Sequence, residues 1–389
     1  MSTVATSPAP PARVAARRGP YAGLVCLQDF ASSADAILPA DVRDYVAGGS
    51  GSELTLRANR SAFDRIQIVP RVLTGAARAD LATRLLGVDV DMPVAMAPMA
   101  YQRLLHPDGE VGTARAARDA GVVFVASMLS SRTIEDIAAT AAATWLQLYW
   151  LHDRRVVGEL VTRAESAGCR AIMLTVDVPR MGRRLRDIRR GFVLPEHVVA
   201  ANLPPEIAAP AHDAKADASA LMVHTSRAFD PALTWLDVDW LRRRTQLPIV
   251  LKGVMHPDDA LRAVELGIDA LVVSNHGGRQ LDGAAASITA LPAISAAVRG
   301  RCELYLDSGV RAGTDVLKAL ALGASGILLG RPALWGLAVG GQAGTAAVLS
   351  LLRTEIEDAM TLAGCPDVAA ASRTTLVSAP AADLITGSG

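Results

Sequence analysis

The sequence predicts an α/β fold, a closed (β/α)8 TIM barrel with a long loop insertion after its fourth strand. Three features predict it: eight short apolar runs, amphipathic stretches between them, and one connection far longer than the others. The runs are Met92–Pro98, Val122–Ser127, Trp145–Tyr149, Ala171–Asp177, Pro248–Gly253, Ala270–His276, Glu303–Asp307 and Gly326–Gly330. Such apolar runs are typical of parallel strands covered on both faces, and eight alternating with helices is the number that closes a barrel. A doubly wound sheet is the alternative, but it usually has fewer strands.

The stretches between the runs are expected to form helices. Examples are Gly109–Ala120, Arg154–Ala167, Pro257–Leu266 and Thr314–Leu322. Each is followed by a glycine, the residue most common after a helix C-terminus. Two acidic residues, Asp258 and Asp315, stand near the expected helix starts, where negative charge is favourable.

One connection departs from this rhythm, because about seventy residues separate Asp177 from Pro248. Residues 186–235 of this connection are predicted to form a lid loop, since long loops at this end of a barrel often carry function. Disorder in its Ala- and Pro-rich middle is compatible with that role. Residues 21–370 are expected to form one barrel domain, with a disordered tail at 1–20 and a C-terminal tail at 371–389.

Composition excludes several classes of function. The 389 residues are 51% hydrophobic and carry 39 basic and 39 acidic side chains, so nothing indicates nucleic-acid binding. No apolar run is long enough to span a membrane, and residues 1–20 lack the apolar stretch of a signal peptide. The four cysteines have no metal-ligand spacing and are expected to be reduced thiols of a cytoplasmic protein; they are Cys26, Cys169, Cys302 and Cys365.

Polar residues gather at the carboxyl ends of the predicted strands, although the strand bodies are apolar. These ends carry Pro98, Met99, Ala100, Ser127, Gln147, Tyr149, Asp177, Lys252, Ser274, Asn275, His276, Asp307, Gly330 and Arg331. Buried polar groups are costly unless they have partners, and the active sites of barrel enzymes lie at these ends. The coincidence favours a ligand site over a set of unrelated core residues.

The ends of the last two strands predict a phosphate site. Asp307, Ser308, Gly309 and Arg311 follow the seventh strand, and Gly330 and Arg331 follow the eighth. Barrels often bind phosphate there, with glycines that admit the backbone and guanidinium groups as donors. The alternative is that the glycines are turn residues and the arginines are solvated. No Gly-x-Gly-x-x-Gly motif opens a helix after a strand, so a dinucleotide site has no support.

The run from Ser274 to Asp282 carries the most chemical information. It places the imidazole of His276 at a strand end and the guanidinium of Arg279 three residues later. An imidazole suits proton abstraction near neutral pH, and a guanidinium suits a carboxylate. Asp177, at the end of the fourth strand, is expected to orient the imidazole and stabilise its charged form.

The same run resembles the FMN-dependent 2-hydroxy acid dehydrogenases and oxidases, a family that includes glycolate oxidase, lactate oxidase and mandelate dehydrogenase. The resemblance covers about Leu27 to Cys365 and includes every strand end. It implies FMN as cofactor, a small 2-hydroxy acid as substrate and a homotetramer as assembly. It implies His276 as general base, with Asp177, Tyr149 and Arg279 also catalytic. The implied substrate-binding residues are Tyr45, Tyr149, Arg184, His276 and Arg279. The implied FMN-binding residues are Pro98, Met99, Ala100, Ser127, Gln147, Thr175, Lys252, Ser274, Asp307, Ser308, Gly309, Arg311, Gly330 and Arg331.

Within the family, four segments resemble the hydroxymandelate oxidases: Tyr101–Leu104, Gln147–Leu151, Met181–Asp187 and Leu194–Asn202. The expected reaction is therefore oxidation of an aromatic (S)-2-hydroxy acid, mandelate or 4-hydroxymandelate, with oxygen as electron acceptor and hydrogen peroxide as product. The alternatives are a quinone acceptor and an aliphatic acid such as lactate or glycolate. One departure concerns Ser308, which stands where the family usually has glycine, so its Cβ could crowd the cofactor loop.

Two further alternatives remain. A different FMN barrel, an isomerase or an inosinate-dehydrogenase-like enzyme, would in the latter case need a catalytic cysteine, and no cysteine ends a strand. A non-enzymatic flavin-binding scaffold predicts damage to the set of His276, Arg279 and Asp177, which is intact.

Overall fold

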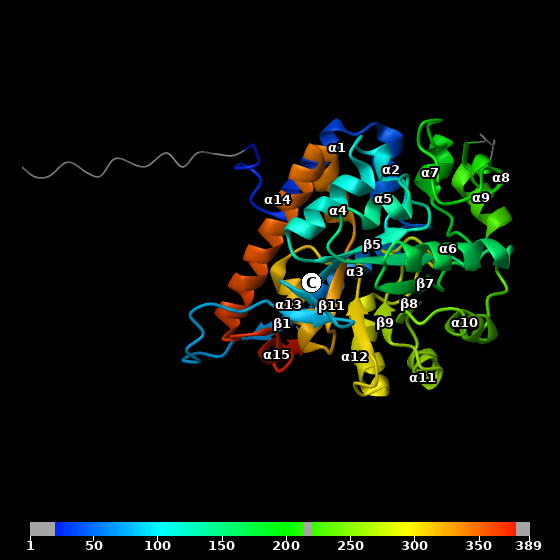
Figure 1. The fold of residues 1–389 in the computed structure, drawn as a ribbon. Coiled ribbons are helices and arrows are strands. Elements are labelled where there is room, and N and C mark those ends of the chain that lie inside the picture. Colours follow the sequence, from blue (N-terminus) through cyan, green and yellow to red (C-terminus); the bar gives the residue numbers. More distant parts are fainter. Residues whose placement is uncertain (1–19, 213–218, 379–389) are drawn as a thin grey trace, which may run out of the picture.

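The computed structural model describes residues 20–212 and 219–378. The predicted N-terminal tail up to residue 19, the middle of the predicted lid loop and residues 379–389 lie outside this range. Eight parallel strands close a barrel in the order β10-β11-β4-β5-β6-β7-β8-β9, which confirms the predicted fold (Figure 1). They are β4 (Val94–Met96), β5 (Val123–Ser127), β6 (Thr144–Leu148), β7 (Ala171–Thr175), β8 (Ile249–Val254), β9 (Ala270–Val273), β10 (Glu303–Leu306) and β11 (Gly326–Leu329). Each lies within, or within one residue of, a predicted apolar run.

The interior of the barrel is filled by side chains, so it is a packed core rather than a channel. Trp145 and Tyr305 meet there with ring centroids 5.7 Å apart. A hairpin of β2 (Thr83–Leu85) and β3 (Val88–Val90) adds Leu85 and Val90 to this cluster. Leu85 lies against Gly326, the first residue of β11. The hairpin therefore covers the amino ends of the strands and leaves the carboxyl ends for the site.

Helices surround the barrel and pack their apolar faces against it. They are α4 (Gly109–Asp119), α5 (Ile134–Ala138), α6 (Arg154–Ser166), α10 (Trp235–Arg242), α11 (Pro257–Glu265), α12 (Ser287–Val298), α13 (Gly313–Ala321) and α14 (Arg331–Ala363), with the 3-10 turn η1 (Gln102–Leu104) after β4. The four predicted helices are confirmed, and the glycine that follows each has a positive φ. Within residues 20–212 and 219–378, α14 is the one helix whose length and composition would allow it to cross a membrane. It is instead a core helix here, because 56% of its most apolar stretch is buried and its backbone breaks at Gly340 and Gly341.

Several elements near the two ends of the described chain lie outside the barrel repeat. They are α1 (Leu27–Ile37), α2 (Ala40–Ala47), α3 (Leu54–Asp64), β1 (Ile66–Val69), α15 (Val368–Ala371) and β12 (Thr375–Ser378). β12 pairs antiparallel with β1, so ordered structure continues to Ser378, beyond the predicted boundary at residue 370. β12 has only four residues, of mixed polarity, and its partner strand lies about three hundred residues away. No pattern in the sequence therefore predicts this pairing. This pairing ties the C-terminal segment to the N-terminal one.

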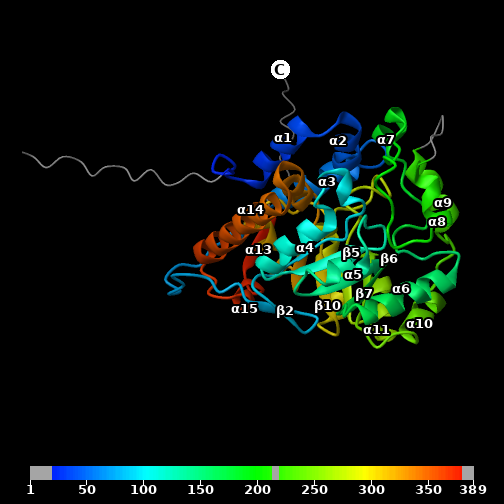
Figure 2. The ribbon, with the colours of Figure 1, turned by 45° about the horizontal axis from the view of Figure 1, so that its top comes forward.

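The connection between β7 and β8, where a lid loop was predicted, contains several short helices among its described residues. It contains α7 (Leu185–Arg190), α8 (Pro205–Ala208), the 3-10 turn η2 (Ala209–His212) and α9 (Ala220–Ala228). These helices were not predicted from the sequence because they are short and Pro and Gly residues separate them. They form because apolar residues such as Phe192 and Val198 are buried, and because the Ser219 side chain caps α9. Figures 1 and 2 both show α7 beside α2 at one end of the barrel.

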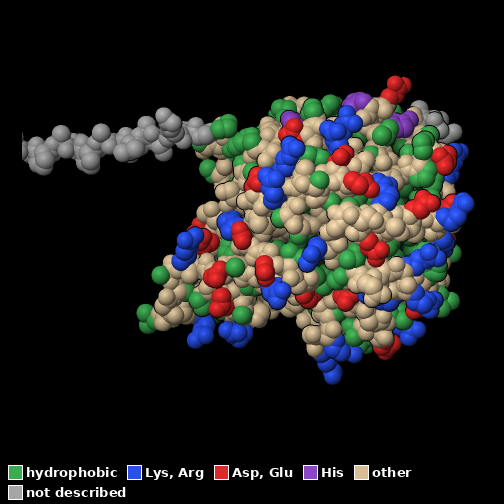
Figure 3. All heavy atoms as spheres, in the orientation of Figure 1, with side chains coloured by type: hydrophobic (Ala, Val, Ile, Leu, Met, Phe, Trp, Pro, Cys, Tyr) green, Lys and Arg blue, Asp and Glu red, His purple; other side chains and the backbone are tan. Residues whose placement is uncertain are grey.

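The surface carries charges of both signs. On the face seen in Figure 3, basic and acidic side chains are interspersed, and no large area of one sign stands out. This agrees with the balanced composition of the chain.

Candidate active site

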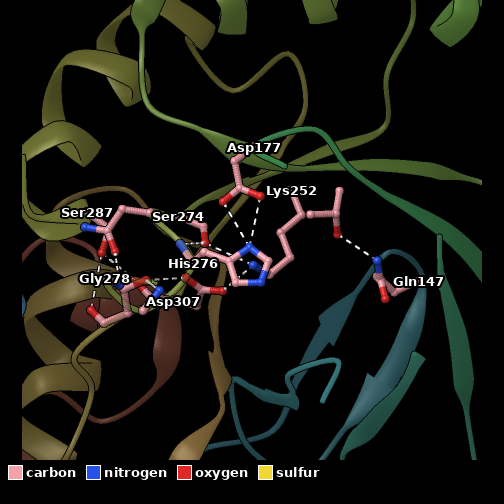
Figure 4. A network of polar contacts seen from close by, with 12 residues as sticks. Gln147, Asp177, Lys252, Ser274, His276, Gly278, Ser287 and Asp307 are labelled. Carbon is pink, nitrogen blue, oxygen red and sulfur yellow. Dashed lines mark hydrogen bonds and ion pairs between the residues drawn. The ribbon is translucent and has the colours of Figure 1, made fainter. Parts of the chain in front are cut away.

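A histidine and an aspartate form the chemical centre of the barrel mouth. His276 follows β9, and its Nδ1 lies 3.0 and 3.2 Å from the two carboxylate oxygens of Asp177, which follows β7 (Figure 4). With Nδ1–H donated to the carboxylate, Nε2 carries the lone pair of the neutral ring. No hydrogen bond from the described residues reaches Nε2. This nitrogen is therefore free to take a proton from a ligand.

The electrostatics of the pair suit a base. Burial lowers the pKa of His276 below its usual value, although the carboxylate of Asp177 opposes this shift. Burial also disfavours the charged form of Asp177, but His276 and Lys252 together hold its pKa below the usual range. At neutral pH the imidazole is therefore unprotonated, and an ionised carboxylate stands ready to stabilise its protonated form.

Two guanidinium groups and a phenol lie beside this pair. Arg279 donates 2.8 Å hydrogen bonds to the carbonyls of Tyr45 and Gly48. These bonds hold the loop that carries His276 and Arg279 against the end of α2. The guanidinium carbons of Arg279 and Arg184 lie 5.3 and 6.0 Å from the centroid of the Tyr45 ring. Burial lowers the pKa of Arg184 to about 10, and the positive charge of Arg279 adds to this effect. Such a cluster suits a ligand carboxylate.

Sequence reasoning missed a buried acid next to these groups. Asp187 is buried on α7, 3.9 Å from Arg184, and neither of its carboxylate oxygens has a hydrogen-bond partner in the described chain. Burial raises its pKa. The residue sits three positions after Arg184 in the sequence, a spacing that brings side chains together on a helix. That spacing was the signal that could have identified it.

The predicted flavin-contacting residues form a hydrogen-bonded row around the strand ends. Ser127 donates to the Gln147 side-chain carbonyl at 3.0 Å, and the Gln147 amide donates to Thr175 at 3.0 Å. On the next strands, Lys252 Nζ donates to Ser274 Oγ and pairs with Asp307, each at 3.0 Å. Burial disfavours the charge on Lys252, but the carboxylates of Asp307 and Asp177 keep its pKa above the usual value. An ammonium group that is charged at neutral pH therefore lines the cavity at the barrel mouth.

Two more guanidinium groups stand where a phosphate was predicted. Arg311 stacks on Trp335, with 4.9 Å from the guanidinium carbon to the ring centroid. Arg331 donates about 3.0 Å bonds to three backbone carbonyls, those of Val46, Gly48 and Gly277. Neither side chain forms an ion pair with a carboxylate of the described chain.

The electrostatic state of these two groups indicates an anionic ligand. Burial lowers the pKa of Arg311 to about 10 and that of Arg331 well below its usual value, with neighbouring arginines adding to both shifts. Uncompensated buried cations are costly, so the arrangement fits a bound phosphate.

One cavity joins these groups. It has about 1270 Å³ of empty space, part of it open to solvent. Most predicted residues line it: Tyr45, Pro98, Met99, Ala100, Ser127, Tyr149, Arg184, Lys252, His276, Arg279, Asp307, Ser308, Gly309, Arg311, Gly330 and Arg331. Four predicted residues do not line the cavity. Gln147, Asp177 and Ser274 make hydrogen bonds to residues that line it, and Thr175 makes a hydrogen bond to Gln147.

The apolar wall of the cavity was not predicted. It includes Leu129, Met181, Leu221, Thr225 and Phe229. Three of these come from the α9 region, where ordinary aliphatic and aromatic residues carry no motif. Tyr149 stacks on Phe229 with ring centroids 4.6 Å apart, which continues this wall to the imidazole.

The fold and the site define an α/β-barrel protein whose mouth could hold an anionic ligand beside an unprotonated imidazole and a cluster of guanidinium groups. A model of the FMN-dependent dehydrogenase family matches residues 34–378. The chain belongs to this family, and within it to the FMN-dependent 2-hydroxy acid oxidases. Membership of the family implies FMN as the cofactor. The predicted resemblance is thereby confirmed.

Known relatives agree. The chain is 52% identical over 349 residues to a 4-hydroxymandelate oxidase of Amycolatopsis orientalis, which covers 90% of this chain and 97% of that protein. It is 49% identical to an L-lactate oxidase of a Nostoc strain, over 83% of this chain and 89% of that protein. A crystal structure of mandelate oxidase with (S)-4-hydroxymandelic acid superposes with a TM-score of 0.89 at 50% identity, over 91% of this chain and 99% of the other. The enzyme class is therefore FMN-dependent oxidation of (S)-2-hydroxy acids.

Proposed function

We propose that this enzyme oxidises an aromatic (S)-2-hydroxy acid, mandelate or 4-hydroxymandelate, to the 2-oxo acid. In the proposed reaction, molecular oxygen accepts the two electrons and two protons and leaves as hydrogen peroxide. The observation that carries the chemistry is the free Nε2 of His276, held by Asp177 next to two guanidinium groups.

Each residue has a role that follows from its contacts. Arg184, Arg279 and the Tyr45 phenol hold the substrate carboxylate and so fix the α-carbon in front of the imidazole. His276 Nε2 takes a proton from the α-carbon or from the hydroxyl, and Asp177 stabilises the resulting imidazolium. FMN, when bound, supplies the two-electron acceptor. Lys252 would lie by its N1–O2 edge and favour negative charge there.

The residues that would hold FMN form two groups. Ser127 and Lys252 would face the ring, with Gln147 and Thr175 behind Ser127 and the Pro98–Ala100 segment against the ring. Arg311 and Arg331 would bind the phosphate, with Gly309 and Gly330 beside them. This assignment fits the two uncompensated guanidinium groups found there.

The apolar wall supports an aromatic substrate over lactate or glycolate. Leu129, Met181, Leu221 and Phe229 are all buried and face the same cavity as the base. Burying a phenyl ring against such a surface contributes about 2 kcal/mol, a gain that a methyl group cannot match. The names of two relatives, 4-hydroxymandelate oxidase and mandelate oxidase, support the same choice and support oxygen as acceptor.

Two further proposals concern the setting. We propose a homotetramer, supported by exposed apolar residues near the β1–β12 ribbon, namely Val69, Val72, Leu73, Leu362 and Val377. We propose a cytoplasmic location, supported by four free cysteines. Light scattering of the purified protein checks the first, and fractionation of the source cells checks the second.

The central test is optical. Purified enzyme is expected to be yellow and to bleach anaerobically with (S)-mandelate but not with (R)-mandelate. In air, oxygen uptake and peroxide formation should match the oxo acid formed. A panel with (S)-lactate and glycolate ranks the substrates. A yellow protein that no 2-hydroxy acid bleaches would overturn the proposal, and bleaching without oxygen uptake would replace oxygen by another acceptor.

A further inference from the structure

Backbone strain is concentrated at the mouth of the barrel. Among the described residues, seven that are not glycine have a positive φ, and three of them line the cavity: Tyr101, His276 and Ser308. Such conformations cost free energy for residues with a Cβ and persist where the surroundings hold them. Ser308 has a φ of 75°, although glycine would adopt this conformation without cost.

The side chain of Ser308 makes two hydrogen bonds that a glycine could not make. Its hydroxyl accepts a 2.8 Å bond from the backbone N–H of Gly277 and donates a 2.7 Å bond to Asp307 Oδ1. Gly277 directly follows the base His276. The hydroxyl thus joins the loop after β9 to the loop after β10.

The loop that receives this bond contains His276, one of the strained residues. His276, Gly277 and Gly278 have φ values of 58°, 67° and 74°, three left-handed residues in succession. Other bonds hold its ends: the His276 N–H donates to Ser274 Oγ, and the Gly278 N–H donates to Asn275 Oδ1. Ser308 supplies the partner for the N–H between them.

We propose that the Ser308 hydroxyl is a positioning group that fixes the His276–Arg279 loop in its reactive geometry. The inference rests on the proposed function of that loop and deepens it. Ser308 does not touch the reacting atoms in this role. It acts through the backbone of Gly277, and through Asp307 it also reaches Lys252, whose Nζ lies 3.0 Å from the other carboxylate oxygen.

The test uses two variants that lose the hydroxyl but differ in backbone strain. Ser308→Ala keeps the Cβ at the positive φ, whereas Ser308→Gly relieves it. Both holoenzymes are assayed for kcat and KM with (S)-mandelate at saturating FMN. The two apoproteins are titrated with FMN by fluorescence quenching, and thermal unfolding of each holoenzyme is recorded.

We expect kcat to fall about ten-fold in both variants, because a loop that is held less firmly keeps His276 in its reactive geometry for less of the time. The KM is expected to change less than about two-fold, because Arg279 stays bonded to the carbonyls of Tyr45 and Gly48 and the Arg184 and Tyr45 contacts remain. FMN affinity should stay within about three-fold, and Ser308→Gly should unfold at the higher temperature of the two.

Other outcomes overturn the proposal. Full kcat in Ser308→Gly would mean that the hydroxyl does not position the base. A large loss of FMN affinity with normal kcat at saturation would assign Ser308 to the cofactor loop. Failure of the wild-type enzyme to oxidise any 2-hydroxy acid is a separate result, because it overturns the proposed function and not the comparison among variants.

Discussion

The strand ends of the barrel and the β7–β8 connection both line the cavity, but they are built differently. At the strand ends, polar side chains satisfy one another in two sets, one that joins Ser127, Gln147 and Thr175 and one that joins Lys252, Ser274, His276 and Asp177. In the connection, buried polar atoms lack partners in the described chain. These atoms are Arg184 Nε, both carboxylate oxygens of Asp187 and both ring nitrogens of His224.

We infer from this difference that the strand ends and the connection have different roles, one in the reaction and one in substrate selectivity. A satisfied network is rigid and keeps the base, the ammonium group and the cofactor-facing side chains in place. Unpartnered buried groups each cost free energy, so these five atoms destabilise the connection. Burial lowers the pKa of His224 to about 4, which keeps its ring neutral inside the connection. We infer that the strand ends supply the base and the cofactor contacts, and that the connection supplies Arg184 and the apolar wall that would contact the substrate side chain.

The sharpest way to break this comparison is to remove the base. His276→Gln should keep the yellow colour and lower the rate of anaerobic flavin bleaching by (S)-mandelate by roughly 10²–10⁴-fold, the usual contribution of a general base. His256→Gln, at the exposed start of α11, is the matched control and should react as wild type. Stopped-flow absorbance measures both. A loss smaller than ten-fold would remove His276 from its assigned role.

The sequence predicted the strand ends better than the connection, for a physical reason. Fully buried parallel strands give continuous apolar runs, so the position of each end, and the polar residue on it, can be read directly. His276, Asp177 and Lys252 were found in this way. The resemblance then added Tyr45 and Arg184, which lie outside the strands.

The cavity-wall residues of the connection escaped prediction because they act through packing and not through motifs, although the connection itself was predicted as a lid loop. Leu221 and Phe229 are ordinary apolar residues until the fold turns them toward the base. The isolated strand β12 was hidden for a similar reason, since its partner β1 is distant in sequence. The unusual φ of Ser308 could be suspected only because glycine is usual there, and its two bonds required coordinates.

The pH dependence offers a second, smaller effect within the strand-end region. Activity needs neutral His276, so kcat/KM should fall as the pH drops through its pKa, which burial places below the usual histidine value. Asp177→Asn removes the carboxylate that raises this pKa. The acidic limb should then move to lower pH, while kcat falls on the order of 100-fold because the imidazolium loses its partner. A limb that moves to higher pH in Asp177→Asn would contradict the assigned pairing.

The smallest expected effect tests the connection itself. Leu221→Ala removes apolar surface from the cavity wall, which should lower kcat/KM for (S)-mandelate about ten-fold and change that for (S)-lactate much less. Leu203→Ala is the matched control, because Leu203 is equally buried in the connection but does not line the cavity. It should lower thermal stability without changing the ratio of the two substrates. Equal losses for mandelate and lactate in Leu221→Ala would show that α9 acts on the base or the cofactor, and the division between the two regions would then be wrong.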